Sequence, residues 1–512
     1  MISQHRWLPS LAVTLWVALF VGLSCSPWRA RLISGDGDAA LHWKVGQWMI
    51  EHRAVLRVDS FSHTRPDTPV VTKEWLAAVL WGAAGQTLGW NGLVLLAALL
   101  IASTVYLLQR QIEAEGTDAL TATLLTLLAA LTCSMHWLAR PLLFTQLFTV
   151  VFNGRLRAFE QGRTSARSLF TWLVPLMIFW ANLHGAFPIG LVIIGLYFLG
   201  NFGRRPEQIR NMRVLGGLLA ACSAATLLNP NGWKLHQIII HYLRHSEFVG
   251  QVNEFLSPNF HSADMRGFEI QLLLLSLLLL GIRPPWSRSE ILLIGAWGYF
   301  AFHSVRNVPI FALVVTPIFA EHLKKHFPQW WETLVSHIEV INRSAAGKIW
   351  MAAAFGCVLL LQPPTEPSSE VFPKAAVEYL KSHPDAMRGR MFNPDHWGGY
   401  LLVELPEQKV FMDSRHEFYG RALLYDYLEV VRGEPEWLGI LDKYDVEWTL
   451  LPTVHPLNQL LKLRQDWEQV HVDPVAAVFR RGKTMHPPHS LHGQHDAAQS
   501  HISSISRIGL SD

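Results

Sequence analysis

The sequence predicts an α-helical polytopic membrane protein that carries a small C-terminal α/β domain. Apolar runs recur along most of the chain, and only 16% of its 512 residues are charged, against about 25% in an ordinary soluble domain. The mean hydropathy of +0.20 is what a strongly apolar part gives when it is averaged with a polar part. These values exclude a mostly disordered chain and a purely soluble enzyme. The net charge of +3 gives no indication of nucleic-acid binding.

The apolar runs give about eleven candidate spans, compared with the roughly 20 residues that one transmembrane helix needs. They lie near residues 11–26, 91–109, 120–137, 142–152, 169–183, 186–201, 214–228, 268–282, 291–303, 308–322 and 348–361. Several are short, so one or two are expected to be re-entrant. The first run follows His5 and Arg6, and a cleaved signal peptide is the alternative interpretation of it.

Basic residues predict the orientation of these spans. With the N-terminus in the cytoplasm, the cytoplasmic loops are those that carry most of the arginines and lysines, at 155–167, 204–213, 283–288 and 324–348. Outer segments between spans, such as 135–141 and 303–307, are short and carry one arginine each. This bias fits an odd number of spans, so everything after about residue 362 is expected outside the cytoplasm.

The chain is predicted to divide into three parts. Residues 1–362 form the multi-span domain, whose first outer segment covers 27–90, and a proline-rich linker begins at 362. Residues 363–482 form the α/β domain, with a helix at 375–382 and short buried strands at 399–403, 409–412, 447–451 and 476–479. The tail 483–512 is expected to be disordered. Metal binding is the alternative for its histidines, which are His486, His489, His492, His495 and His501.

The first outer segment carries an acidic motif, Gly35-Asp36-Gly37-Asp38. Two carboxylates at i and i+2 between glycines can point from a turn toward one ligand. Asp36 and Asp38 are therefore candidates for a general base or for oxygen ligands of a divalent metal. A solvated Asp-Gly turn is the alternative. Farther along the segment lie His42, on a stretch with helical spacing, and Glu74, a third carboxylate.

Polar residues also collect at the predicted outer ends of later spans. They are Arg140, Asn182, His184, Asn229, Glu254 and Arg306. Each alone is explained by helix-end chemistry or by a snorkelling arginine. Together they are harder to dismiss, because ionisable and amide groups near a membrane are costly and usually functional. Arginine and histidine on one side of the membrane suit an anionic phosphate group.

Two further residues stand out in the C-terminal domain. Asp413 and Arg415 directly follow the predicted strand 409–412, where α/β domains tend to present ligand-binding groups. A structural salt bridge within the loop is the alternative. The four cysteines all lie in apolar stretches, which supports neither a disulfide framework nor a zinc site.

Four motifs, spread over almost the whole chain, resemble those of the bacterial GT-C-type membrane glycosyltransferases. These multi-span enzymes use lipid-phosphate-linked sugars outside the cytoplasm. The motifs are the acidic loop with Asp59-Ser60-Phe61-Ser62-His63-Thr64 and Lys73-Glu74-Trp75-Leu76; Trp180-Ala181-Asn182-Leu183-His184-Gly185; Leu228-Asn229-Pro230-Asn231-Gly232; and Trp397-Gly398-Gly399-Tyr400 with Val410-Phe411-Met412-Asp413-Ser414-Arg415. The most similar members are a poorly characterised subgroup.

The resemblance implies a function and a set of roles. A sugar would move from a polyprenyl-phosphate donor to a glycan, lipid or protein acceptor by single displacement with inversion, at the outer face of a bacterial inner membrane. Asp36 or Asp38 would be the general base, with Glu74 as a third catalytic candidate. Arg140, His184 and Arg306 would bind the donor phosphate. His42, Asn182, Asn229, Glu254, Asp413 and Arg415 are the further substrate-binding candidates. No metal is assigned, and a divalent ion held with the help of Glu254 is the alternative.

Two other functions compete with this one. A transporter or flippase would carry charges along a path through the spans and usually has related halves, whereas the span interiors here are nearly uncharged and no internal repeat is evident. A non-catalytic scaffold of the same fold, binding a cell-envelope partner through the C-terminal domain, would retain the same motifs for structural reasons.

Overall fold

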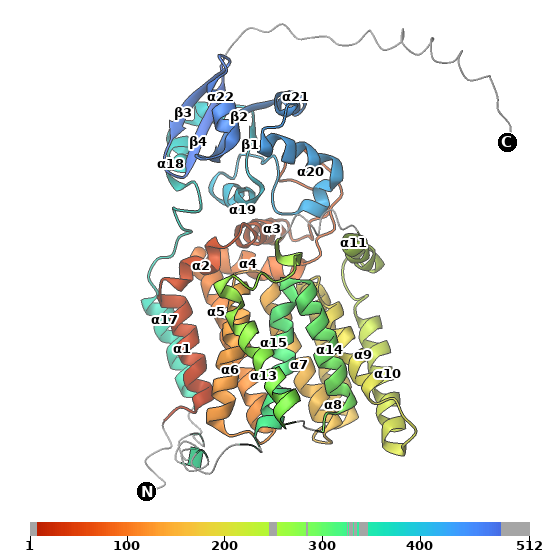
Figure 1. Cartoon of the computed structure of the whole chain (residues 1–512). Helices are drawn as coiled ribbons and strands as arrows, with labels where there is room; N and C mark the ends of the chain where they lie inside the picture. The colour runs from red at the N-terminus through yellow and green to blue at the C-terminus, as the bar shows by residue number, and fades with distance from the viewer. Residues whose placement is uncertain are drawn as a thin grey trace, which may run out of the picture.

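The protein is a helical bundle with a small α/β domain at one end (Figure 1). The computed structural model describes residues 8–244, 253–282, 285–324 and 347–482, together with 326, 331, 335, 336 and 342. The histidine-containing tail at 483–512 lies outside the described residues. We call the end of the bundle that meets the α/β domain the domain end, and the other the far end.

A helix lies at each of the predicted apolar runs. The bundle helices are α1 (Leu11–Cys25), α5 (Trp90–Ala114), α6 (Ala119–Cys133), α7 (Leu142–Glu160), α8 (Ala166–Leu183), α9 (Pro188–Gly200), α10 (Pro206–Ala225), α13 (Arg266–Leu277), α14 (Arg288–His303), α15 (Val308–Leu323) and α17 (Gly347–Leu361). Among the described helices, three are long and apolar enough to cross a membrane, and the pair α1–α2, bent by 71°, would make a fourth. The number of spans, about eleven, stays a prediction.

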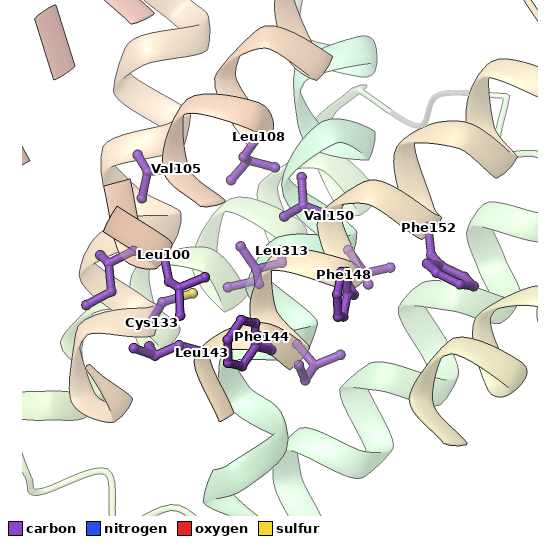
Figure 2. Packing of buried hydrophobic residues seen from close by; sticks show 14 of the residues in the cluster. Leu100, Val105, Leu108, Cys133, Leu143, Phe144, Phe148, Val150, Phe152 and Leu313 are labelled. Carbon is purple, nitrogen blue, oxygen red and sulfur yellow. The ribbon is translucent and has the colours of Figure 1, made fainter. Parts of the chain in front are cut away.

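The bundle is held together by apolar packing around α15. Every residue of α15 from Val308 to Ala320 is buried, as expected of a helix that is apolar all round. The surrounding helices contribute aromatic and branched side chains, among them Phe144, Phe148 and Phe152 of α7 (Figure 2). Because these side chains interdigitate, the ends of the helices are fixed relative to one another.

A charged cluster closes the far end. Arg157 of α7 contacts Glu115, which follows α5, with 2.8 Å between Nε and Oε2, and Glu290 of α14 at 3.3 Å. It also pairs with Glu321 of α15. The side chains of Arg157 and Glu115 are only 3% and 1% exposed, so ion pairing stabilises their charges in place of water.

Three short helices, α2 (Trp28–Ser34), α3 (Asp38–His52) and α4 (Trp75–Leu88), belong to the predicted outer segment and lie at the domain end (Figure 1). The helical spacing at 42–51 predicted α3, whereas α2 and α4 were not predicted. The backbones of α3 and α4 nearly touch: a Cβ on Gly46 would lie 1.8 Å from the carbonyl oxygen of Ala78. Small residues at this crossing therefore hold α3 across the top of the bundle.

The C-terminal domain is a four-stranded sheet with helices. Its elements are α18 (Lys374–Ser382), β1 (Arg390–Phe392), α19 (Asp395–Glu404), α20 (His416–Arg432), α21 (Trp437–Lys443), β2 (Val446–Pro452), α22 (Pro456–Lys462), β3 (Trp467–Val472) and β4 (Ala476–Arg481). The strand order is β1-β2-β4-β3, with β1 parallel to β2 and the other pairs antiparallel. The predicted helix at 375–382 and the strands at 447–451 and 476–479 are confirmed.

Two of the predicted strands are wrong. Residues 399–403 belong to helix α19, and 409–412 form only an isolated bridge, between Ser62 and Val410. A short, buried apolar run does not distinguish a strand from a buried helix by its periodicity, and 399–403, which is fully buried up to residue 402, is such a run. Strands β1 and β3 were not predicted.

The outer segment is bound tightly to the C-terminal domain. Backbone hydrogen bonds join His63 N to Val410 O and Val410 N to Phe61 O, both at 3.0 Å. The side chains of Thr64 and Arg65 donate to the carbonyl oxygens of Phe411 and Tyr419. The domain is therefore fixed over α3, directly above the acidic motif.

Candidate active site

Arg140 brings the two aspartates of the acidic motif together. It lies in the turn before α7, and this turn is joined to the end of α2 by a hydrogen bond of 2.7 Å from Ala139 N to Leu32 O. Nη1 of Arg140 is 3.0 Å from Oδ2 of Asp36 and 4.0 Å from Oδ2 of Asp38. The two aspartate side chains remain 26% and 31% exposed, so a ligand can still reach them.

Asp36 has the proton affinity of a general base. Burial raises its pKa, the charge of Asp38 raises it further, and Glu254 acts in the same direction. Arg140 opposes these effects, and the pKa is raised to about 7. A carboxylate with this pKa accepts a proton more readily than an ordinary aspartate and is still partly ionised at neutral pH.

Glu254 joins Arg140 to Arg306. Its carboxylate pairs with Arg140 Nη2 through one oxygen, and its other oxygen is 3.9 Å from Arg306 Nη1. Burial alone would raise the pKa of Glu254, but Arg140 and Arg306 outweigh it and lower the pKa to about 2. Glu254 is therefore ionised at neutral pH and occupies the position between two guanidinium groups, where another anion would be favoured.

His184 and His42 meet on Glu74. Nε2 of His42 is 3.4 Å from Glu74 Oε2, and Nε2 of His184 is 3.4 Å from the other carboxylate oxygen, Oε1. The pKa of His184 is lowered, chiefly by burial and then by the charges of Arg306 and Arg140. His184 is therefore a neutral imidazole at pH 7, and it offers a hydrogen bond rather than a positive charge.

The proton on His184 is placed by its partners. Trp180 Nε1 donates to Thr145 Oγ1 at 2.8 Å, and the Thr145 hydroxyl, which can still donate or accept, lies 2.7 Å from His184 Nδ1. Because the Glu74 carboxylate, 3.4 Å from Nε2, is an acceptor, we assign the imidazole proton to Nε2, and Thr145 then donates to Nδ1. Arg306 Nη2 is 3.5 Å from the same Nε2; with the proton there, this is a contact between two donors and not a hydrogen bond.

The predicted asparagines hold backbone rather than line the charged cluster. Asn182 accepts from Trp75 Nε1 at 2.6 Å and donates to the carbonyl oxygens of Ile178 and Leu228. Asn229 bonds to the backbone of its own turn, including Thr226 O at 2.7 Å. Their contacts keep the ends of α8 and α10 and the start of α4 in place around Glu74 and His184.

Asp413 and Arg415 form the structural salt bridge that was their alternative. The guanidinium group of Arg415 contacts Asp413, two residues away, and Asp59, 356 residues away, at 2.6 and 2.8 Å. Both aspartate side chains are fully buried, and Tyr419 OH donates to Asp413. This cluster joins the outer segment to the start of α20. Its aspartates are buried and paired with Arg415, so they are not presented to a ligand at the end of a strand.

One residue of the site was not predicted. His136 ends a short 3-10 helix (Ser134–His136) four residues before Arg140, and its Nδ1 is 3.1 Å from Arg140 Nη2 and 3.7 Å from Glu254. The residues between them are not helical, so no sequence periodicity pairs the two side chains. Over the part of the chain that the structure describes, no group of three or more His, Cys, Asp or Glu side chains is arranged to hold a metal ion. Asp36 and Glu254 face the guanidinium group of Arg140 instead.

No protein-family model matches the chain, and no curated protein does. Solved structures do. The oligosaccharyltransferase AglB from Archaeoglobus fulgidus, in complex with an inhibitory peptide and a dolichol-phosphate, matches with a TM-score of 0.56 and 12% identity over 86% of this chain and 69% of that one. ArnT from Cupriavidus metallidurans, bound to undecaprenyl phosphate, matches with a TM-score of 0.53 and 13% identity over 93% of this chain and 98% of that one.

This chain has the GT-C fold. The expectation drawn from the four motifs is thereby confirmed at the level of the fold. At these identities the likeness does not extend to the donor, the acceptor or the site residues.

Proposed function

We propose that this GT-C protein transfers a sugar from a polyprenyl-phosphate donor to the hydroxyl group of a glycan, lipid or protein acceptor. One observation carries the proposal: Arg140 contacts both the carboxylate of Asp36 and an anion position that it shares with Arg306. A base and a phosphate-binding pair thus lie side by side. The complexes of AglB with a dolichol-phosphate and of ArnT with undecaprenyl phosphate support a lipid-phosphate ligand for this fold.

The reaction would be a single displacement. Asp36 takes the proton of the acceptor hydroxyl while the acceptor oxygen forms a bond to C1 of the sugar. The bond between C1 and the phosphate oxygen breaks, and its electron pair stays on the phosphate. Arg140 and Arg306 offset the charge that grows there, and His184 can donate a hydrogen bond. One displacement inverts the configuration at C1. General base catalysis of this kind contributes about 10²–10⁴-fold.

Asp38 and Glu74 would have supporting roles in this scheme. Asp38 lies 4.0 Å from Arg140, and its negative charge helps to raise the pKa of Asp36. Glu74 holds His42 and His184 and faces the proton of His184. In a bacterial inner membrane with the N-terminus in the cytoplasm, the domain end would be the extracytoplasmic face.

A transfer assay with purified protein tests the proposal. The protein is incubated with radiolabelled polyprenyl-phosphate hexoses and pentoses, and both transfer and donor hydrolysis are measured. We expect activity in the wild type and a loss of about 10²–10⁴-fold in Asp36→Asn. Asp264→Asn is the matched control, because Asp264 is an exposed aspartate paired with Arg31.

The outcomes separate the competing functions. Full activity in both Asp36→Asn and Asp38→Asn would remove the assigned base. No transfer and no hydrolysis with any donor would favour a non-catalytic scaffold. Accumulation of intact donor inside vesicles would favour a transporter or flippase.

A further inference from the structure

We infer that helix α19 of the C-terminal domain is a positioning element for the general base, and that Gly399 and Gly37 are the residues that allow it to act. The inference rests on the proposed function and deepens it. It assigns a role to the Trp397-Gly398-Gly399-Tyr400 motif, which no step of the displacement uses.

The backbone of α19 lies directly on the acidic motif. A Cβ on Gly37 would be 2.3 Å from the carbonyl oxygen of His396, and a Cβ on Gly399 would be 2.5 Å from the carbonyl oxygen of Gly37 and 2.7 Å from Leu41 N. Contacts this short are with backbone atoms, which cannot move aside as a side-chain end could. Gly37, between Asp36 and Asp38, can therefore pack directly against α19 only because neither it nor Gly399 has a side chain.

The other side of the acidic motif is fixed to the bundle. Arg140 holds Asp36, and the turn that carries Arg140 is bonded to the end of α2. The linker that leads into the C-terminal domain also contacts this point, since Ser368 N donates to Ser34 Oγ at 2.8 Å. The motif is thus enclosed between the Arg140 turn on one side and α19 on the other.

Helix α19 is itself held firmly enough to set a position. Asp395 at its start accepts from His416 Nε2 at 2.6 Å and from Tyr427 OH at 3.0 Å, and its backbone N donates to Tyr427 OH. Trp397 Nε1 donates to Val371 O at 2.9 Å. These contacts tie the first turn of α19 to α20 and to the linker, so a shift of α19 would be transmitted to Gly37.

A small shift would change the chemistry of Asp36. Its distance of 3.0 Å from Arg140 sets how much the guanidinium group offsets the effect of burial on its pKa. A displaced motif would lose part of this attraction, and the pKa of Asp36 would rise. Misplacement of a reacting group by about 1 Å can cost about 10²-fold in rate.

Neighbouring glycines provide a matched pair of variants. In Gly399→Ala the new methyl group meets Gly37 and Leu41 of the multi-span part, whereas in Gly398→Ala it meets Met412 and Asp413 inside the C-terminal domain. Both crowd α19, but only the first presses on the acidic motif. We expect Gly399→Ala to lower kcat by about 10²-fold, to leave the donor KM nearly unchanged, and to move the acidic limb of the pH profile to higher pH. Gly398→Ala, which can reach the acidic motif only through a shift of α19, should move that limb less.

A second measurement does not depend on activity. In a background without Cys25, Cys133, Cys222 and Cys357, the variant Asp38→Cys is labelled with a membrane-impermeant maleimide. We expect Gly399→Ala to raise the labelling rate several-fold and Gly398→Ala to raise it by a smaller factor. If Gly399→Ala fails to fold, Tyr427→Phe, which loosens the start of α19 without adding volume, should raise the rate by a smaller factor.

The two proposals fail in different ways. An active wild type whose pH limb and labelling rate are the same in Gly399→Ala would overturn the positioning role and leave the proposed function standing. A wild type that neither transfers nor hydrolyses any donor would overturn the proposed function. In that case, unchanged labelling in Gly399→Ala would still contradict a positioning role for α19, and increased labelling would show only that α19 holds the acidic motif in place, with no base assigned to it.

Discussion

Replacing Arg140 by glutamine should move the pH dependence of sugar transfer. Asp36 must be ionised to act as the base, so activity rises with pH through its pKa of about 7. Arg140 is the group that opposes the effect of burial on this pKa, with a contact of 3.0 Å. A hydrogen bond to a charged partner contributes about 1.5–3 kcal/mol. At about 1.4 kcal/mol for each pKa unit, its loss would place the rising limb at about pH 8–9.

The assay is kcat/KM for the donor against pH, which reports the pKa of the free enzyme, for the wild type and Arg140→Gln. At pH 7, where the wild-type carboxylate is already only half ionised, the shift alone should lower activity by about 5- to 50-fold, and activity should recover as the pH rises. Arg306→Gln is the matched control, because Arg306 contacts Glu254 and His184 rather than Asp36. It should raise the donor KM and leave the limb in place. A limb that stays at the same pH in Arg140→Gln would refute the assignment of Asp36 as the titrating base.

Three further predictions concern the charged contacts. Glu254→Gln should lower the donor KM by about tenfold, since it removes the carboxylate that competes with the donor phosphate for Arg140 and Arg306. Steady-state kinetics measure this, and a higher KM would contradict it. Arg157→Leu should destabilise the bundle by about 3–5 kcal/mol, because it removes the guanidinium group that Glu115, Glu290 and Glu321 share and leaves the buried Glu115 with only the more distant Arg163, at 3.4 Å; thermal unfolding in detergent measures this, with an unchanged donor KM as the check. Arg415→Leu should destabilise the C-terminal domain by a similar free energy, since it leaves the buried Asp413 and Asp59 without their ion pair. Hydrogen exchange measures this, and an unchanged exchange rate in the C-terminal domain would contradict it.

The helices were predictable because their signal is local. An apolar run long enough to form a helix is visible in the sequence itself, and every predicted run is helical. The short buried run at 399–403 was not assigned correctly, because a strand and a buried helix of this length show the same apolar pattern. The β3 strand has mostly exposed or half-exposed residues and lacks the apolar run that marks a buried strand.

The site was predictable as a set of residues and not as a set of contacts. The chemistry of each group marks Asp36, Arg140 and Glu254 as candidates, but Glu254 lies 114 residues beyond Arg140, and nothing in either local sequence pairs them. The same limit applies to Asp413 and Arg415. Their structural role becomes evident only once Asp59, far away in the chain, is seen to share the guanidinium group.

The central claim is that the donor phosphate binds beside the carboxylate that serves as the base. An experimental structure of the protein with a non-hydrolysable polyprenyl-phosphate sugar tests it most directly. The claim predicts the phosphate within hydrogen-bonding distance of Arg140 and Arg306, with Glu254 displaced from between them and C1 of the sugar facing Asp36. A phosphate bound at the far end near Arg157, or a sugar turned away from Asp36, would contradict it.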